Sequence, residues 1–146
     1  MKEKSLDLRY LVLAIVGYSE DQTLPGRTLL QKRAYFINKL LKTDMPFAPY
    51  YYGPYSEKLA DATDSLVAEG FLKETLESFP SNSGGIFERH KYTYKLTPIG
   101  SQLLEIIEKE SSIFLDIKKI NKTLEEEIGC DSRFINHHQS LLGSGS

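Results

Sequence analysis

Hydrophobic residues recur at helical spacing in four segments of the chain, and a pair of alternating segments lies between the third and the fourth. The first helical segment begins after Ser5 and fades in the polar stretch at residues 19–22. Steps of three and four residues place its apolar side chains on one face, which we expect to lie in the core. These side chains belong to Leu8, Leu11, Val12, Ile15 and Val16.

A second helix is predicted from Thr28 to about Lys42, directly after the turn signal Pro25-Gly26. Thr28 and Gln31 have the spacing of a capping box, in which the hydroxyl accepts from the amide of the third helical residue and Gln31 reaches back. One face of this helix is apolar, and the opposite face carries a cationic stripe. The apolar face consists of Leu30, Ala34, Ile37 and Leu41, and the stripe of Lys32, Tyr35, Lys39 and Lys42.

Three prolines and Gly53 between Met45 and Ser56 exclude a continuous helix there, so we expect an extended piece and a tight bend. Ser56 then caps a third helix, which ends at Gly70. Its inward face is mainly apolar, whereas its outward face is acidic. The inward positions are Leu59, Thr63, Leu66 and Val67, and the outward ones are Glu57, Lys58, Asp61, Asp64, Ser65 and Ala68.

The alternating segments predict a two-stranded hairpin. Residues 71–79 form its first strand, residues 80–85 a tip rich in serine and glycine, and residues 86–96 the return strand. Alternation places Tyr92, Tyr94 and Leu96 on one face of the return strand. The other face is basic, because it carries Arg89, Lys91, Thr93 and Lys95.

Thr97 and Pro98 open the last helical region, as its N-cap and first helical residue. Its apolar residues then alternate steps of three and four, which resembles one edge of a coiled coil, and a break is expected at Ser111-Ser112. We expect a homodimer formed through residues 99–128. The alternative is one or two helices folded back within the same chain.

The order of these elements predicts a mainly α protein with a small β-hairpin, in the α+β class. Helix, turn, helix and hairpin together suggest a winged helix-turn-helix with a long C-terminal helical extension. We expect this domain to span residues 1–98 and the C-terminal helical segment to span residues 99–130. Residues 131–146 form a tail that the sequence specifies poorly, and its last four residues resemble a linker.

Composition restricts the function classes. A chain of 146 residues is long enough for one domain with its own core. It has no apolar run that could cross a bilayer and no export signal, so we expect a cytoplasmic location and no membrane partner. The lone Cys130 cannot form an intramolecular disulfide. The net charge of −2 means that any contact with nucleic acid must depend on local clusters of positive charge.

Two such clusters support a first hypothesis, a dimeric transcriptional regulator that binds duplex DNA. Residues of the second helix would hold one phosphate backbone, Ser56 and Lys58 would lie at the groove, and the hairpin would form a wing contact. The alternative for a cationic stripe on a surface helix is simple solvation. The predicted DNA-binding residues are Arg27, Lys32, Arg33, Lys39, Lys42, Ser56, Lys58, Arg89, Lys91 and Lys95.

A second hypothesis is a protein-interaction module on the same fold, because the third helix presents three carboxylates where a recognition helix would meet phosphates. We expect no enzyme, cofactor or metal site. The sequence lacks a phosphate-binding glycine loop, a His-Glu-x-x-His motif and a CxxC pair. A metal or nucleophile site could be drawn from His137-His138 with Asp131 or Cys130, but we interpret the histidines as ordinary surface residues, because adjacent side chains point in different directions.

The segment Gly26-Arg27-Thr28-Leu29-Leu30-Gln31-Lys32 and the later Tyr52-Gly53-Pro54-Tyr55-Ser56 carry a resemblance over about residues 8–100. The chain resembles small bacterial and archaeal winged-helix proteins with a Leu-Gln-Lys helix and a Tyr-Gly-Pro segment. More distantly it resembles the Panacea-type antitoxin domain, from which it departs at Arg33, Ala34 and the tyrosine run. The resemblance implies a winged-helix fold and a regulatory or antitoxin-like context, and it supplies no catalytic residues. The protein-interaction hypothesis corresponds to an antitoxin-like or defence-associated adaptor.

Overall fold

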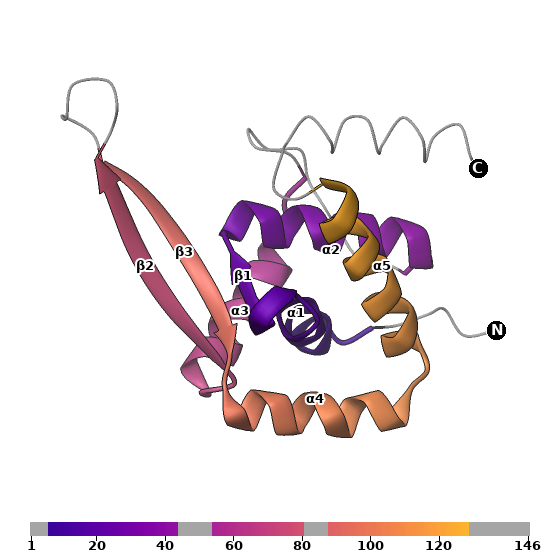
Figure 1. Cartoon of the computed structure of the whole chain (residues 1–146). Coiled ribbons are helices and arrows are strands. Elements are labelled where there is room, and N and C mark those ends of the chain that lie inside the picture. The colour runs from indigo at the N-terminus through magenta and orange to yellow at the C-terminus, as the bar shows by residue number, and fades with distance from the viewer. Residues whose placement is uncertain (1–5, 44–53, 81–87, 129–146) are drawn as a thin grey trace.

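Helix α1 (Leu8–Gly17) lies at the centre of the molecule in this computed structural model, capped by the Asp7 carboxylate, which accepts from Arg9 N at 2.9 Å. Figure 1 shows α1 nearly end-on, with the other helices and the sheet around it. Every residue from Leu11 to Val16 is buried, so the helix is covered on all sides rather than on the one predicted face. The structure describes residues 6–43, 54–80 and 88–128, the side chains of 78–80, 88–90 and 127–128 excepted.

A short strand that the sequence pattern does not predict, β1 (Thr23–Pro25), follows α1 and a 3-10 turn over Glu20–Gln22. It pairs antiparallel with β3 and makes the sheet three-stranded among the described residues, in the order β1-β3-β2. Three residues that end in proline are too short to show an alternating pattern, which is why only the hairpin was predicted. The fold is therefore mainly helical with a small antiparallel sheet, as the α+β prediction required.

Helix α2 (Arg27–Leu41) has the predicted core face, and Leu30, Ala34, Ile37 and Leu41 are all buried. The predicted capping box does not form. Gly26 is the N-cap, at a φ of 121° that favours glycine, and it provides no side-chain cap. Thr28 lies inside the first turn, and the Gln31 side chain binds a different segment of the chain.

Helix α3 (Glu57–Ala68) begins as predicted, because the Ser56 hydroxyl accepts from Leu59 N at 3.2 Å. The helix stops before Gly70, whose φ of 84° reverses the chain into the sheet. Leu59, Thr63 and Leu66 are buried against α1, and the predicted outward positions of α3 are exposed.

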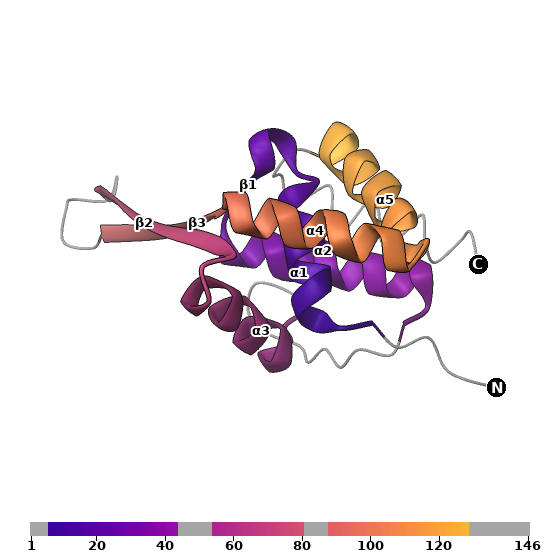
Figure 2. The same ribbon diagram turned by 90° about the horizontal axis from the view of Figure 1, so that it is seen from below.

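Strands β2 (Leu72–Pro80) and β3 (Glu88–Leu96) form a hairpin that extends away from the helices (Figure 2). Paired residues lie on the same side of the sheet, so the register defines two faces. The inner sheet face packs toward the helices, with Tyr94 and Leu96 buried, and the outer sheet face points away. Described side chains of the inner sheet face are Leu72, Glu74, Leu76, Tyr92, Tyr94 and Leu96, and those of the outer sheet face are Lys73, Thr75, Glu77, Lys91, Thr93 and Lys95.

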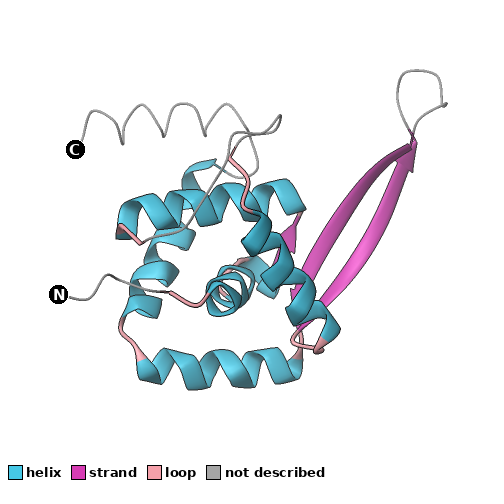
Figure 3. Cartoon of the chain, turned by 180° about the vertical axis from the view of Figure 1, so that it is seen from behind, coloured by secondary structure: helices cyan, strands magenta, loops and turns pink. Residues whose placement is uncertain are grey.

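The C-terminal region consists of α4 (Pro98–Glu110) and α5 (Ile113–Ile128), separated at Ser111-Ser112 as predicted. Thr97 caps α4 by accepting from Gly100 N at 3.1 Å. Both helices border α1 and share its hydrophobic core (Figure 3).

The structure therefore does not show the continuous coiled-coil edge that was expected to pair with a second subunit. Phe114, Ile117 and Leu124 are buried inside the chain, which is the folded-back alternative. Ile99 and Ile106 of α4 remain exposed, so a homodimer through this region stays a prediction.

Candidate docking surfaces

The start of α3 is fixed to α2 by a reciprocal pair of hydrogen bonds. The Gln31 side chain donates to Ser56 O at 3.0 Å, and its oxygen accepts from Ser56 N at 2.8 Å. Gln31 is 6% exposed and Ser56 is 2% exposed. Because Ser56 is buried, the Gln31 side chain takes the place of water as the hydrogen-bond acceptor of its backbone amide. The Gln31 side chain therefore ties the N-terminus of α3 to α2.

The outward side of α3 carries Glu57, Asp61 and Asp64, which we call the acidic face, with Lys58 beside them. All are exposed, and among the described residues none of the three carboxylates forms an ion pair. Glu57 lies in the first helical turn, where a carboxylate is stabilised by the helix dipole. Asp61 and Asp64 lie too far along the helix for that explanation.

A groove of about 480 Å³ lies between the acidic face on one side and the first turn of α2 and strand β3 on the other. Carboxylates line its α3 side, and Arg27 with the buried ring of Tyr94 lines the opposite side. The groove has aromatic and apolar walls together with unpaired carboxylates, so it suits a segment that combines apolar and cationic side chains. Its lining includes Arg27, Gln31, Tyr55, Glu57, Asp61 and Tyr94.

Arg27, predicted to contact DNA, is bound to the inner sheet face. Its Nε donates to the Tyr94 hydroxyl at 2.9 Å, its terminal nitrogen lies 3.3 Å from Glu74, and its guanidinium stacks 3.7 Å from the centre of the Tyr92 ring. Burial works to lower the pKa of Arg27, but the hydrogen bonds to Tyr94 and Glu74 outweigh it and raise the pKa. Arg27 thus anchors α2 to the hairpin.

The same contacts act on Tyr94, whose hydroxyl donates to Glu74 at 2.8 Å. Burial and this hydrogen bond raise the pKa of Tyr94 beyond its ordinary range, although Arg27 acts in the opposite direction. Tyr94 remains protonated at neutral pH and serves as a bridge between the cation and the carboxylate.

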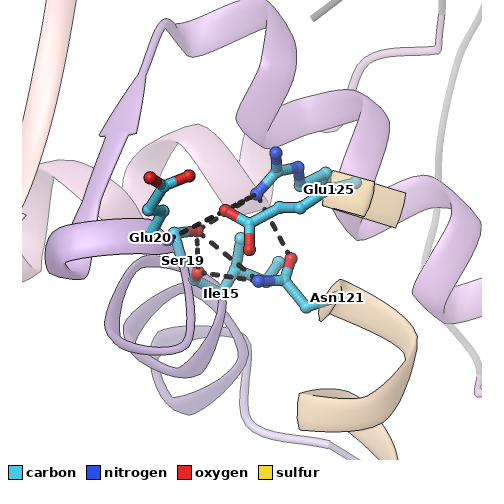
Figure 4. A network of polar contacts seen from close by, with 6 residues as sticks. Ile15, Ser19, Glu20, Asn121 and Glu125 are labelled. Atoms are coloured by element: carbon cyan, nitrogen blue, oxygen red, sulfur yellow. Dashed lines mark hydrogen bonds and ion pairs between the residues drawn. The ribbon is translucent and has the colours of Figure 1, made fainter. Parts of the chain in front are cut away.

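Arg33 is the clearest correction to the predicted DNA-binding set, because its side chain is only 7% exposed. Its terminal nitrogen lies 3.1 Å from Ser19 Oγ and 3.4 Å from the Glu125 carboxylate, and 3.5 Å from the Asn121 amide oxygen. Glu125 also accepts from Glu20 N at 2.9 Å, so this network joins α5 to the end of α1 and to α2 (Figure 4). Arg33 supports the core and is not a surface cation.

Ser56 is the second correction. It is buried as the N-cap of α3 and cannot meet a nucleic acid groove. Lys58, by contrast, is exposed as predicted, although it is surrounded by the acidic face.

The lysine stripe of α2, Lys32, Lys39 and Lys42, lies on its outward side. Lys39 and Lys42 are exposed and Lys32 is half-buried, and the Lys39 ammonium lies 5.3 Å from the centre of the Tyr35 ring. Lys42 is the C-cap in a left-handed conformation, with a φ of 56°.

Lys91 and Lys95 are exposed on the outer sheet face, as the alternation predicted. The side chain of Arg89 lies outside the described residues. The register adds Lys73, directly opposite Lys95, which is not among the predicted DNA-binding residues.

The two cationic clusters therefore do not meet. Helix α2 packs on the inner sheet face through Arg27, so Lys91 and Lys95 point away from the lysine stripe. A single basic surface that includes all ten predicted DNA-binding residues is not formed.

Among the described residues, no helix is both long and apolar enough to span a membrane, and no cluster of histidine, cysteine and carboxylate side chains could hold a metal ion. Cys130, Asp131, His137 and His138 lie outside the described part of the chain, as do the tyrosines at positions 50–52.

Comparison with models of known protein families finds no match for this chain, so the resemblance to the Panacea-type domain stays a prediction. Comparison with individual proteins finds a relative in Bacillus subtilis (strain 168), described as the uncharacterized protein YwgA. The two sequences are 31% identical over 129 residues, which cover 86% of this chain and 68% of YwgA. At this identity and coverage, the chain belongs to the same family as YwgA.

Proposed function

We propose that the chain is a winged-helix binding module without catalytic activity, and that the acidic face of α3 docks a basic segment of a partner protein. The observation that carries this proposal is the set of exposed, unpaired carboxylates Glu57, Asp61 and Asp64 beside the groove, within the described residues. Solvent-exposed carboxylates with no internal partner supply charge complementarity, which sets specificity and association rate more than affinity.

The order of the elements supports the winged-helix assignment. Helices α2 and α3 form the helix-turn-helix, and the β2–β3 hairpin that follows takes the place of the wing. The short β1 strand, inserted before α2, connects this hairpin to the helical part.

The acidic face also explains why a protein is a better ligand for α3 than DNA. In a DNA complex α3 would enter the major groove, where each carboxylate would repel nearby phosphates by about 1 kcal/mol or more. Lys58 supplies a single positive charge against three negative ones. The first hypothesis, a regulator that reads DNA with α3, therefore has less support than a protein-docking role.

An antitoxin-like or defence-associated adaptor is the context that the Leu-Gln-Lys and Tyr-Gly-Pro resemblance supports. Such a protein acts by occupying a surface of its partner, and it needs no catalytic residue. We place it in the cytoplasm, as expected from the sequence.

Affinity capture from the native cell tests the proposal. Tagged wild type is compared, after nuclease treatment, with the double variant Asp61→Asn/Asp64→Asn. The matched control Glu105→Gln/Glu126→Gln removes the same charge from exposed positions of α4 and α5. Loss of two exposed ion pairs, at about 1 kcal/mol each, weakens binding about 30-fold.

The expected result is a stoichiometric protein partner that the wild type and the control capture and the α3 variant loses. Capture of that partner equally by the α3 variant, or recovery of nucleic acid with no protein, would contradict the proposal. Unfolding of each variant by urea verifies that the substitutions leave the fold intact.

A further inference from the structure

The outer sheet face is the most cationic surface of the described hairpin. Lys73, Lys91 and Lys95 are exposed on it, with Glu77 as its only described carboxylate. Glu77 is paired with Lys91 in the register and accepts from the Thr93 hydroxyl at 3.4 Å, so its carboxylate lies on the outer sheet face and offsets one of the three positive charges. Among the described residues none of the three lysines forms an ion pair.

Lys73 and Lys95 are directly opposed across β2 and β3. Side chains in such a position have Cβ atoms about 5 Å apart, and like charges there destabilise a sheet. A sequence that places two lysines directly opposite each other breaks a local rule of sheet formation. Such departures are expected where a surface serves a function, because a bound polyanion removes the repulsion.

We propose that the outer sheet face binds the sugar-phosphate backbone of duplex DNA through Lys73, Lys91 and Lys95. This surface is on the opposite side of the hairpin from Arg27, and it includes no residue of the acidic face. The proposal is thus independent of the protein-docking role of α3, and a chain with both surfaces joins a protein partner to DNA.

The spacing of the lysines fits a phosphate backbone. Lys91 lies four residues from Lys95 along β3, which corresponds to about 13 Å. Duplex DNA carries a negative charge for about every 1.7 Å of its axis, so each ammonium group finds a phosphate without an exact register. Thr75 and Thr93, between the lysines, add hydroxyl groups that can donate to phosphate oxygens.

The chemistry of the face favours a duplex over a single strand. Single-strand binding surfaces stack bases on aromatic rings. The tyrosines of β3, Tyr92 and Tyr94, are on the inner sheet face, and the outer-face positions from Lys73 to Lys91 carry threonines and Glu77 rather than aromatic residues, with Phe79 beyond them in the register. Lysine and threonine contacts to the backbone carry no sequence information, so the binding is independent of sequence.

Fluorescence anisotropy with a labelled 20-base-pair duplex, measured at several salt concentrations, tests this proposal. Three phosphate contacts give a slope of log K against log salt of about −2.7, so that binding weakens about 40-fold between 50 and 200 mM salt. Lys73→Gln and Lys95→Gln each reduce the slope by about 0.9. Glu77→Gln strengthens binding, because it removes the carboxylate beside the lysines.

Matched controls locate the surface. Lys119→Gln on α5 and Lys39→Gln on the lysine stripe leave the slope unchanged, since neither lies on the outer sheet face. Circular dichroism verifies that Lys73→Gln folds, with a melting temperature equal to or above that of the wild type, because the like-charge pair is gone.

The proposal is overturned by the absence of binding at 50 mM salt, or by a slope that Lys73→Gln and Lys95→Gln do not change. Tighter binding to a single strand of the same length also overturns it. So does equal binding to phosphatidylserine vesicles with the same dependence on Lys73, because the surface would then recognise anionic membranes rather than DNA.

Discussion

Replacement of Gln31 by methionine tests how much its two hydrogen bonds to Ser56 contribute to stability. Methionine has nearly the same length and fills the same volume, but it neither donates to Ser56 O nor accepts from Ser56 N. The carbonyl of Ser56 keeps its bond from Ala60 N at 3.1 Å, whereas the buried amide of Ser56 loses its side-chain acceptor.

The structure sets the magnitude. An unsatisfied buried amide costs about 1–3 kcal/mol, and the second lost hydrogen bond costs about 1 kcal/mol. Part of this is offset by the burial of an apolar side chain, so Gln31→Met is expected to lower the free energy of unfolding by about 2–3 kcal/mol. Ser56→Ala keeps both backbone bonds to Gln31 and loses only the N-cap, at about 1 kcal/mol.

Urea unfolding followed by circular dichroism measures both variants against Gln102→Met, which makes the same change at an exposed position of α4. With a slope of about 1.5–2 kcal/mol/M, the Gln31→Met midpoint falls by more than about 1 M. A Gln31→Met protein as stable as the Gln102→Met control, or more stable than Ser56→Ala, would refute the role assigned to this side chain.

Three further predictions follow from particular contacts. A methyl group at Gly100 would overlap the backbone oxygen of Phe71. Gly100→Ala should therefore lower the free energy of unfolding by about 3 kcal/mol and the melting temperature by about 10 °C. An unchanged melting temperature would contradict this packing. Tyr18 and Tyr94 have raised pKa values through burial and hydrogen bonds to Glu108 and Glu74, so the folded state keeps protons that the unfolded state releases. The contribution of these two tyrosines to stability should therefore be constant below about pH 10 and be lost above it, and ultraviolet titration should show both tyrosines ionising late. An alkaline stability profile that Tyr94→Phe leaves unchanged would argue against this linkage. If α4 pairs two copies as the sequence predicts, light scattering should give twice 16.6 kDa for the wild type and the single mass for Ile106→Lys, whereas a monomeric wild type at high concentration would exclude that dimer.

The sequence was sufficient to predict those helix ends that are determined by the residues at the ends themselves. Ser56 and Thr97 accept the predicted cap hydrogen bonds, and Gly70 ends α3 with a positive φ. Alternation along β3 also separated the lysines from the tyrosines, because a strand has a period of two residues whatever it packs against.

The errors involve partners that are distant along the chain. Gln31 has the spacing of a capping box, but its amide binds Ser56, 25 residues away. Arg33 was assigned to the surface, and its partners Asn121 and Glu125 come from α5 only because that helix folds back. The sequence does indicate that Arg33 is close to the core. Arg33 follows Leu29 by four residues and precedes Phe36 by three, so it lies beside the apolar face of the helix and not among the lysines.

Lys73 was missed for a different reason. Its role depends on which residue of β3 it faces, and a hairpin register requires the length of the turn as well as the pattern of the strands. The separation of the two cationic clusters likewise depends on which face of the sheet packs on the helices, which is the face that buries Leu72, Tyr94 and Leu96 and that Arg27 contacts through Tyr92.

We propose that the fold keeps the acidic face of α3 and the cationic outer sheet face apart, so that each binds its own partner independently. The most direct test measures both partner capture and duplex binding in two variants, Asp61→Asn/Asp64→Asn and Lys73→Gln/Lys95→Gln. We predict that the first loses the protein and retains the salt-dependent DNA affinity, and that the second shows the reverse. Loss of both activities in either variant would contradict the separation of the two surfaces.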